Sequence, residues 1–388
     1  MTADPPPRPR APSSRGEPLL AQLARRAVLL VTVLAMVSAA FGAVALASST
    51  GTLNATPSED SDPYLASGLA FQDPPDADLD AAGGGLTITL DAADMRYELG
   101  GGTWAWGQAY DGSSTVPTLR FLPGAQVNVR LVNHLPVATK VHFHGLHMAA
   151  RSEGEVVCVA PGTSRTYHLA IPAGHPQGTY WYHSHVLATA CPSTTDPGST
   201  AGATPGPAPG STGRPPPASP PGSETGPAPG YAGLSGALIV GDDRASLPVA
   251  YRTVATHTFV LQETSADCLV NGQFRPVLAM RPNETQLWRL VNAGMDASYQ
   301  LRLDGYRFTV VAEDGAPLVA VRTADALSLS PGKRYDVLVT ANDHPGDTWL
   351  RATMTAGKDE DGDHYPDATL VHVAVAGRAV GRLPPLGG

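Results

Sequence analysis

After residue 85 the chain alternates between short runs of apolar, often β-branched residues and breaks made of Gly, Pro and Asn. Such runs, bounded by turn residues, predict β-strands, and no stretch in this part shows a sustained helical period. The pattern therefore predicts an all-β protein of the sandwich kind. The strands expected in the first half are Leu86–Leu90, Thr118–Phe121, Gln126–Val132, Lys140–Leu146, Ser164–Ile171, Thr179–His185 and Gly233–Val240.

The N-terminal segment follows a different pattern. Residues 1–26 contain five arginines, and residues 27–47 are 21 uncharged, mostly apolar residues. This length can cross a bilayer as a helix, and the small residues at its end also suit cleavage of a signal peptide. In both cases the arginines stay on the cytoplasmic side, so the rest of the chain is exported. We expect an extracytoplasmic protein, either secreted or held by a single-pass membrane anchor.

Two further segments show no strand or helix pattern. Residues 48–84 are rich in Ser, Asp and Pro and predict a flexible linker, whereas residues 191–230 are almost entirely Pro, Gly, Ser, Thr and Ala. The second segment is expected to be a disordered insertion within a domain, because the strand pattern resumes at Gly233. Charged residues make up only 16% of the chain and its net charge is −9, so nucleic acid is not an expected partner.

An internal repeat divides the folded part of the chain. Residues 123–133 read PGAQVNVRLVN and residues 282–292 read PNETQLWRLVN, so Arg-Leu-Val-Asn recurs after 159 residues. A second match sets residues 178–185 against residues 346–353. The repeat predicts two tandem copies of one β-sandwich. The expected domains are residues 85–243, with the insertion at 191–230, and residues 244–377, followed by a tail at 378–388.

Four of the twelve histidines form two pairs in the first copy. His142 and His144 lie in Val-His-Phe-His-Gly, and His183 and His185 lie in Tyr-Trp-Tyr-His-Ser-His. Alternate residues of a strand project to the same face, so each pair presents two imidazoles in one direction. Imidazole binds copper, zinc, iron and nickel. Two such pairs on neighbouring strands predict a four-nitrogen metal site.

The second copy lacks these histidines. The repeat sets the first pair against Leu301 and Leu303, and it sets the second pair against Arg351 and Thr353. A fold that forms without the four histidines does not need them for stability, so metal binding explains them better. Three other histidines are expected to have strand, loop or surface roles, namely His147, His168 and His175. Cys158 and Cys191 are candidates for a disulfide in an exported protein.

These motifs resemble those of the multicopper oxidases, laccase-like and of the three-domain type. The two histidine motifs, with Gly-Leu-Ser-Gly-Ala-Leu-Ile-Val at 233–240, are similar to the first cupredoxin domain of that family. Trp-Arg-Leu-Val-Asn at 288–292 and Ser-Pro-Gly-Lys-Arg-Tyr-Asp at 330–336 are similar to its second domain. The resemblance implies two tandem cupredoxin-like Greek-key β-sandwiches. It also implies copper as the cofactor, with His142 as a type 2 ligand and His144, His183 and His185 as type 3 ligands.

The chemistry implied by the resemblance is oxidation of a reductant coupled to reduction of dioxygen to water. The family pattern also includes a third cupredoxin domain, with His-Cys-His for type 1 copper, and no such motif occurs in this sequence. We therefore expect the isolated chain to be inactive without a third cupredoxin domain, which a partner chain could carry. Two alternatives stay open: a non-catalytic copper-binding module or degenerate fragment, and a purely structural cupredoxin pair. The reductant also stays open.

Overall fold

The structure is a computed structural model in which the described residues form ten ranges. They are residues 68–78, 87–100, 103–113, 115–148, 158–184, 233–241, 243–263, 268–294, 297–354 and 368–386. The predicted apolar segment at 27–47 and the insertion at 191–230 lie outside these ranges. Within them, no helix combines the length and the apolar character needed to cross a membrane.

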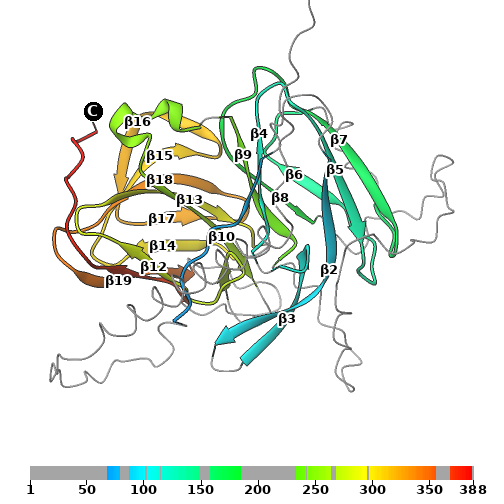
Figure 1. The fold of residues 1–388 in the computed structure, drawn as a ribbon, viewed down its shortest axis with the longest axis horizontal. Coiled ribbons are helices and arrows are strands. Elements are labelled where there is room, and N and C mark those ends of the chain that lie inside the picture. Colours follow the sequence, from blue (N-terminus) through cyan, green and yellow to red (C-terminus); the bar gives the residue numbers. More distant parts are fainter. Residues whose placement is uncertain are drawn as a thin grey trace, which may run out of the picture. The chain divides into compact units, whose positions relative to one another are not determined.

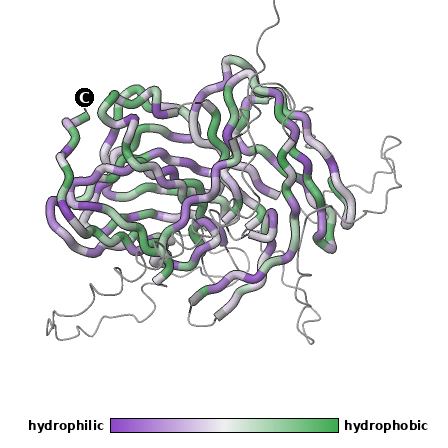
Figure 2. Tube along the Cα trace, viewed as in Figure 1, coloured by the Kyte–Doolittle hydropathy of each residue, from purple (hydrophilic) through white to green (hydrophobic). Residues whose placement is uncertain are grey.

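Strands make up nearly all the regular structure of these ranges, as the sequence predicts (Figure 1). The only helical elements described are two short 3-10 turns, at Asp243–Ser246 and Val249–Tyr251. Hydrophilic and hydrophobic residues alternate along many strands (Figure 2), because one face of these strands packs into a core and the other does not. The all-β prediction is confirmed.

The first half of the described chain forms two sheets. One has the order β1-β4-β9-β8-β6, and the other has the order β3-β2-β5-β7. The bounds are β1 Asp76–Asp78, β2 Thr87–Gly100, β3 Thr103–Tyr110, β4 Thr118–Phe121, β5 Gln126–Asn133, β6 Val141–His144, β7 Ser164–Ala170, β8 Gly178–Ser184 and β9 Ser235–Val240. Sequence reasoning missed β1, which lies inside the segment 48–84 predicted as a flexible linker and pairs with β4. It also missed β3, in which Ala105, Gly107 and Ala109 interrupt the strand formers and which is held by its pairing with β2.

The second half forms two more sheets, in the orders β11-β10-β13-β18-β15-β16 and β12-β20-β19-β14-β17. Its strands are β10 Ala255–Glu263, β11 Cys268–Val270, β12 Val277–Met280, β13 Thr285–Asn292, β14 Tyr299–Leu303, β15 Phe308–Glu313, β16 Ala316–Ala324, β17 Leu327–Leu329, β18 Arg334–Thr340, β19 Gly346–Met354 and β20 Ala368–Val375. Each half has its own large apolar core. We call the two halves the first and the second sandwich; the predicted domain boundary at residue 243 stays a prediction.

The strand pairing confirms the internal repeat. Strand β5 pairs in parallel with β2 and antiparallel with β7, and strand β13 does the same with β10 and β18. The Asn of the shared motif is the last residue of both strands, and its side chain forms the same kind of hydrogen bonds in both. The side-chain nitrogen of Asn133 donates to the carbonyls of Val137 and Val159, and that of Asn292 donates to the carbonyls of Ala297 and Leu329. Both asparagines are fully buried, so the repeated motif anchors the loops that follow it.

We predict that Asn292→Ala lowers the free energy of unfolding by about 2 kcal/mol, because two buried carbonyls lose their donor. Urea unfolding followed by circular dichroism measures this change. Asn128→Ala is the matched control, because Asn128 stands on β5 and its only described side-chain bond is an exposed one to His168. The control should change the free energy of unfolding by no more than about 0.5 kcal/mol. Equal losses in the two variants would contradict the anchoring role.

Candidate metal centre

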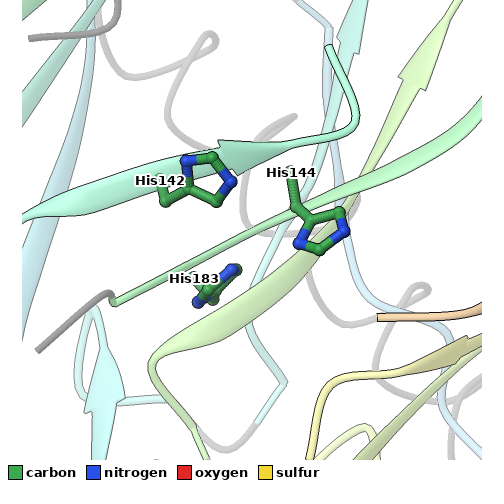
Figure 3. A group of neighbouring side chains, drawn as sticks. All are labelled: His142, His144 and His183. Carbon is green, nitrogen blue, oxygen red and sulfur yellow. The ribbon is translucent and has the colours of Figure 1, made fainter. Parts of the chain in front are cut away.

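Three of the four predicted ligands lie together on two neighbouring strands. Strand β6 carries His142 and His144, and β8 carries His183; the two strands pair antiparallel, with His142 directly opposite His183. The burial of β6 alternates: Val141 and Phe143 enter the core of the first sandwich and the two histidines face away from it. Strand alternation therefore turns all three imidazoles toward one space, as Figure 3 shows.

The three histidines form a compact, half-buried group. Their candidate ligand nitrogens all lie within 4.8 Å of one another. The ring of His183 lies 5.2 Å from that of His142 and 5.8 Å from that of His144, between centroids. Among the described residues this is the one cluster of at least three His, Cys, Asp or Glu with such spacing. The fourth predicted ligand, His185, lies outside the described residues.

The ring of His183 is held in a defined orientation. Its Nδ1 donates a hydrogen bond of 2.8 Å to the carbonyl of Ser184, which places the proton on Nδ1 and makes Nε2 the metal-binding nitrogen. Trp181 stacks on the same ring with a centroid distance of 4.1 Å and an interplanar angle of 17°. Trp181 also lies 5.0 Å from the ring of His144. This tryptophan therefore limits the rotation of two candidate ligands.

The other histidines of the first sandwich have structural contacts. His175 Nε2 accepts a hydrogen bond from the backbone N–H of His147, and His175 Nδ1 donates to the carbonyl of Pro176. Burial lowers the pKa of His175, so its ring is neutral. The exposed His168 pairs with Asn128 at 2.6 Å. The strand and loop roles predicted for His168 and His175 are therefore confirmed.

The cysteines agree with the predicted disulfide. Cys158 is disulfide-bonded, whereas Cys268 is a buried thiol that forms no disulfide. The chain has three cysteines, so a Cys158–Cys191 bond would leave Cys268 outside any disulfide, which agrees with this observation. Cys191 itself lies outside the described residues.

One detail of the repeat alignment is wrong: the first histidine pair does not correspond to Leu301 and Leu303. Those leucines are buried core residues of the second sandwich, and their equivalents on β6 are Val141 and Phe143, which are also buried. With this assignment, the register of β6 with β8 matches that of β14 with β19. A shift of one residue turns every side chain of a strand to the opposite face. The alignment must therefore move by one residue at this strand.

The positions in the second sandwich that correspond to the three histidines carry Arg302, Asp304 and Arg351. Arg302 lies opposite Arg351 in the strand register, as His142 lies opposite His183. Arg351 Nε donates to Asp304 Oδ2 at 2.6 Å, and both side chains are partly exposed. A surface ion pair therefore occupies the face that carries the imidazole cluster in the first sandwich.

The second sandwich nevertheless contacts the cluster, which sequence reasoning did not predict. A Cβ atom on Gly332 would lie 2.9 Å from Cε1 of the His144 ring. Arg334, which is 5% exposed, donates from Nε to the carbonyl of Thr179 on β8. Both residues belong to the Ser-Pro-Gly-Lys-Arg-Tyr-Asp motif at 330–336, whose family resemblance was the only sequence signal for them.

The chemistry of the donor set fits copper. Three imidazole nitrogens form the cluster, and imidazole is a good ligand for copper, as it is for zinc, iron and nickel. The cluster includes no carboxylate, whereas magnesium and calcium sites consist of oxygen ligands. All three histidines are half-buried, so the cluster is partly accessible to solvent.

Comparison with known proteins agrees with this chemistry. Two family models described as multicopper oxidase match the chain, one at residues 91–197 and the other at residues 242–374. The multicopper oxidase MmcO of Mycobacterium tuberculosis is 27% identical over 289 residues, which are 66% of this chain and 52% of that protein. Laccase-2 of Botryotinia fuckeliana is 26% identical over 264 residues, or 62% of this chain and 41% of that protein. The chain thus spans about half the length of these relatives, or less.

Solved structures show the same fold. A laccase-like multi-copper oxidase, CueO, from Ochrobactrum sp. superposes with a TM-score of 0.58 at 22% identity, covering 82% of this chain and 67% of that chain. The multicopper oxidase of Campylobacter jejuni gives a TM-score of 0.59 at 20% identity, covering 86% and 67% respectively. At this identity the likeness supports the cupredoxin-like architecture of the two sandwiches.

Proposed function

Because this chain belongs to the multicopper oxidase family, whose cofactor is copper, we propose that His142, His144 and His183 are copper ligands. The observation that carries the proposal is the convergence of three imidazoles from two paired strands within 4.8 Å. His185 is proposed as the fourth ligand, because it stands two residues after His183 in the sequence, the same spacing as that of His142 and His144. The type 2 role of His142 and the type 3 roles of the others rest on the family resemblance.

The proposed activity is oxidation of a reductant coupled to the reduction of dioxygen to water. Multicopper oxidases use dioxygen and a reducing substrate. When bound, copper supplies the one-electron redox chemistry. The residues of this chain bind and orient it: the Nδ1–H bond to the Ser184 carbonyl keeps the Nε2 lone pair of His183 directed at the cluster. The Trp181 indole covers one face of that ring and keeps water from it.

We further propose that electron entry needs a cupredoxin domain beyond these 388 residues, in the same gene product or in a partner chain. Two observations support this requirement: the sequence has no His-Cys-His motif for type 1 copper, and the chain spans about half the length of MmcO. A non-catalytic copper-binding module is the second candidate function, and the same missing motif favours it. The reducing substrate is therefore proposed to be oxidised by the complete protein and not by these 388 residues alone.

Export from the cytoplasm is part of the proposal. The uncharged segment at 27–47 supports it, either as a signal peptide or as a single-pass anchor. The disulfide at Cys158 also supports it, because disulfides persist in oxidising compartments outside the cytoplasm.

Copper content and dioxygen consumption test the proposed function together. The purified chain is loaded with copper, dialysed and analysed by mass spectrometry for metal, and dioxygen uptake is then followed with hydroquinone or cuprous ion as reductant. We expect the chain to retain copper at no less than equimolar amount and to consume dioxygen no faster than its His142→Ala variant. A wild-type chain that retains no copper would refute the proposed site. Rapid dioxygen uptake by the wild type alone would refute the requirement for a further domain.

A further inference from the structure

Gly332 of the second sandwich lies directly against a proposed copper ligand of the first. A Cβ atom at Gly332 would be 2.9 Å from Cε1 and 3.1 Å from Nε2 of His144. Real Cβ atoms essentially never lie as close as 2.9 Å to another side-chain atom. Any residue other than glycine would therefore push the imidazole aside. Gly332 also has a φ of +78°, a conformation that glycine adopts without penalty.

The backbone around Gly332 is fixed from both sides. Its N–H donates to the carbonyl of Asn292 at 2.9 Å, and its own carbonyl accepts a hydrogen bond from Arg334 Nη1 at 3.0 Å. Asn292 is the buried anchor at the end of β13, and the N–H of Asn292 in turn donates to the carbonyl of Lys333. The core of the second sandwich therefore determines where Gly332 meets the His144 ring.

Arg334 extends the same contact to the backbone beside the ligand. Its Nη2 donates to the carbonyl of Asp314, and its guanidinium lies 5.7 Å from the centroid of the Tyr180 ring. Gly145, the residue after His144, has a φ of +84°, and a Cβ there would be 2.7 Å from Arg334 Nη2. The guanidinium thus packs against the turn that follows the ligand.

On its other side, the His144 ring lies against Trp181, which itself packs on the second sandwich. Trp181 forms a buried cluster with Ala237 of the first sandwich and with Val260, Val291 and Ala293 of the second. The ring of His144 is 5.0 Å from that of Trp181 and also contacts Gly332. Two contacts that depend on the second sandwich therefore restrict one ligand.

We propose that Gly332 is a positioning residue for His144, so that the second sandwich, which has no imidazole at the equivalent positions, sets the geometry of the copper site. The proposal rests on the proposed role of His144 as a copper ligand. Metal–ligand distances in genuine sites lie within about 0.2 Å of their standard values. A displaced His144 ring would therefore weaken the site without any change in its ligands.

The test compares Gly332→Ala with Gly305→Ala in the full chain. Gly305 also belongs to the second sandwich and has a φ of +75°, but a Cβ there would meet nothing within 4 Å. The control therefore reproduces the backbone strain without the contact. Copper affinity is measured by competition with a chelator, the Cu(II) site by electron paramagnetic resonance, and the His144 ring in the metal-free protein by NMR.

We expect Gly332→Ala to bind copper about 10- to 100-fold more weakly, as other contacts that orient ligands do. Its Cu(II) hyperfine splitting and its metal-free His144 resonance should also shift, whereas Gly305→Ala should match the wild type in all three. The midpoint temperature of thermal unfolding should decrease similarly in both variants, because both place alanine at a positive φ. If Gly332→Ala fails to fold, Gly332→Asn replaces it, since asparagine tolerates this conformation and retains the Cβ.

The outcomes separate the two proposals. An unchanged His144 resonance in the metal-free Gly332→Ala protein, or wild-type affinity and spectrum in the copper-loaded one, would overturn the positioning role. A wild-type chain without copper would overturn the proposed function instead, and the metal-free NMR comparison would still decide whether Gly332 sets the His144 ring.

Discussion

Replacement of His183 by alanine is expected to weaken copper binding by more than about 100-fold, since loss of even an outer contact costs about 10- to 100-fold. The surrounding structure holds His183 in a defined orientation. Its Nδ1 is bonded to the Ser184 carbonyl, its ring stacks on Trp181, and it lies opposite His142 in the sheet. Removing it leaves only the two imidazoles of β6 among the described ligands. Chelator competition followed by metal analysis measures the loss.

The second sandwich offers a matched control for this variant. His372 is also a half-buried strand histidine stacked on a tryptophan, Trp349, with an interplanar angle of 14°. Its Nε2, however, pairs with a carboxylate oxygen of Asp347 at 2.8 Å, and it belongs to no described histidine cluster. His372→Ala should therefore leave copper binding unchanged. Equal copper affinity of the two variants would refute the assignment of the site.

Arg334→Ala is expected to lower the free energy of unfolding by about 3–4 kcal/mol. Arg334 is 5% exposed and donates to the carbonyls of Thr179, Gly332 and Asp314. Alanine would leave these acceptors without that donor and would open a cavity beside Tyr180. Burial lowers the pKa of Arg334, but the guanidinium still carries its charge at neutral pH. Arg334→Lys should restore only part of the loss, because one ammonium cannot serve the same spread of carbonyls.

Denaturant unfolding with two probes measures this effect. Arg307→Ala serves as the control, because among the described residues the side chain of Arg307 forms only a surface ion pair with Asp325, in which both side chains are more than half exposed. The control should change the free energy of unfolding by less than about 1 kcal/mol. A loss in Arg334→Ala no greater than in this control would show that the contact between β8 and the 330–336 motif contributes nothing to stability.

The sequence was sufficient to predict the strands around the site. All seven strands expected in the first half occur, with ends that move by a few residues, except that β2 continues to Gly100. Strands of a sandwich alternate between core and solvent, so their pattern is local and visible in the sequence. The same alternation placed His142 and His144 on one face, and this prediction is confirmed by the side chains in Figure 3.

The alignment of the two copies failed where the sequence had no local signal. Arg-Leu-Val-Asn identifies β5 with β13, but the loop that leads to β6 differs in length from the loop that leads to β14. A one-residue difference cannot be placed from composition alone, and it decides which face a side chain occupies. Only the burial of Leu301 and Leu303 showed that Arg302 and Asp304 correspond to the histidines.

What the sequence alone determined was the all-β architecture, the tandem repeat and the histidine pairs on neighbouring strands, three of whose four members the structure describes. These features depend on periodicity and on residue type. The tertiary structure alone decided which parts of the second sandwich touch those histidines. Gly332 is 188 residues from His144 in the sequence, and the two meet because separate cores bring a turn of one sandwich onto a strand end of the other. Contacts of this kind depend on packing between distant segments, which leaves no periodic pattern in the chain.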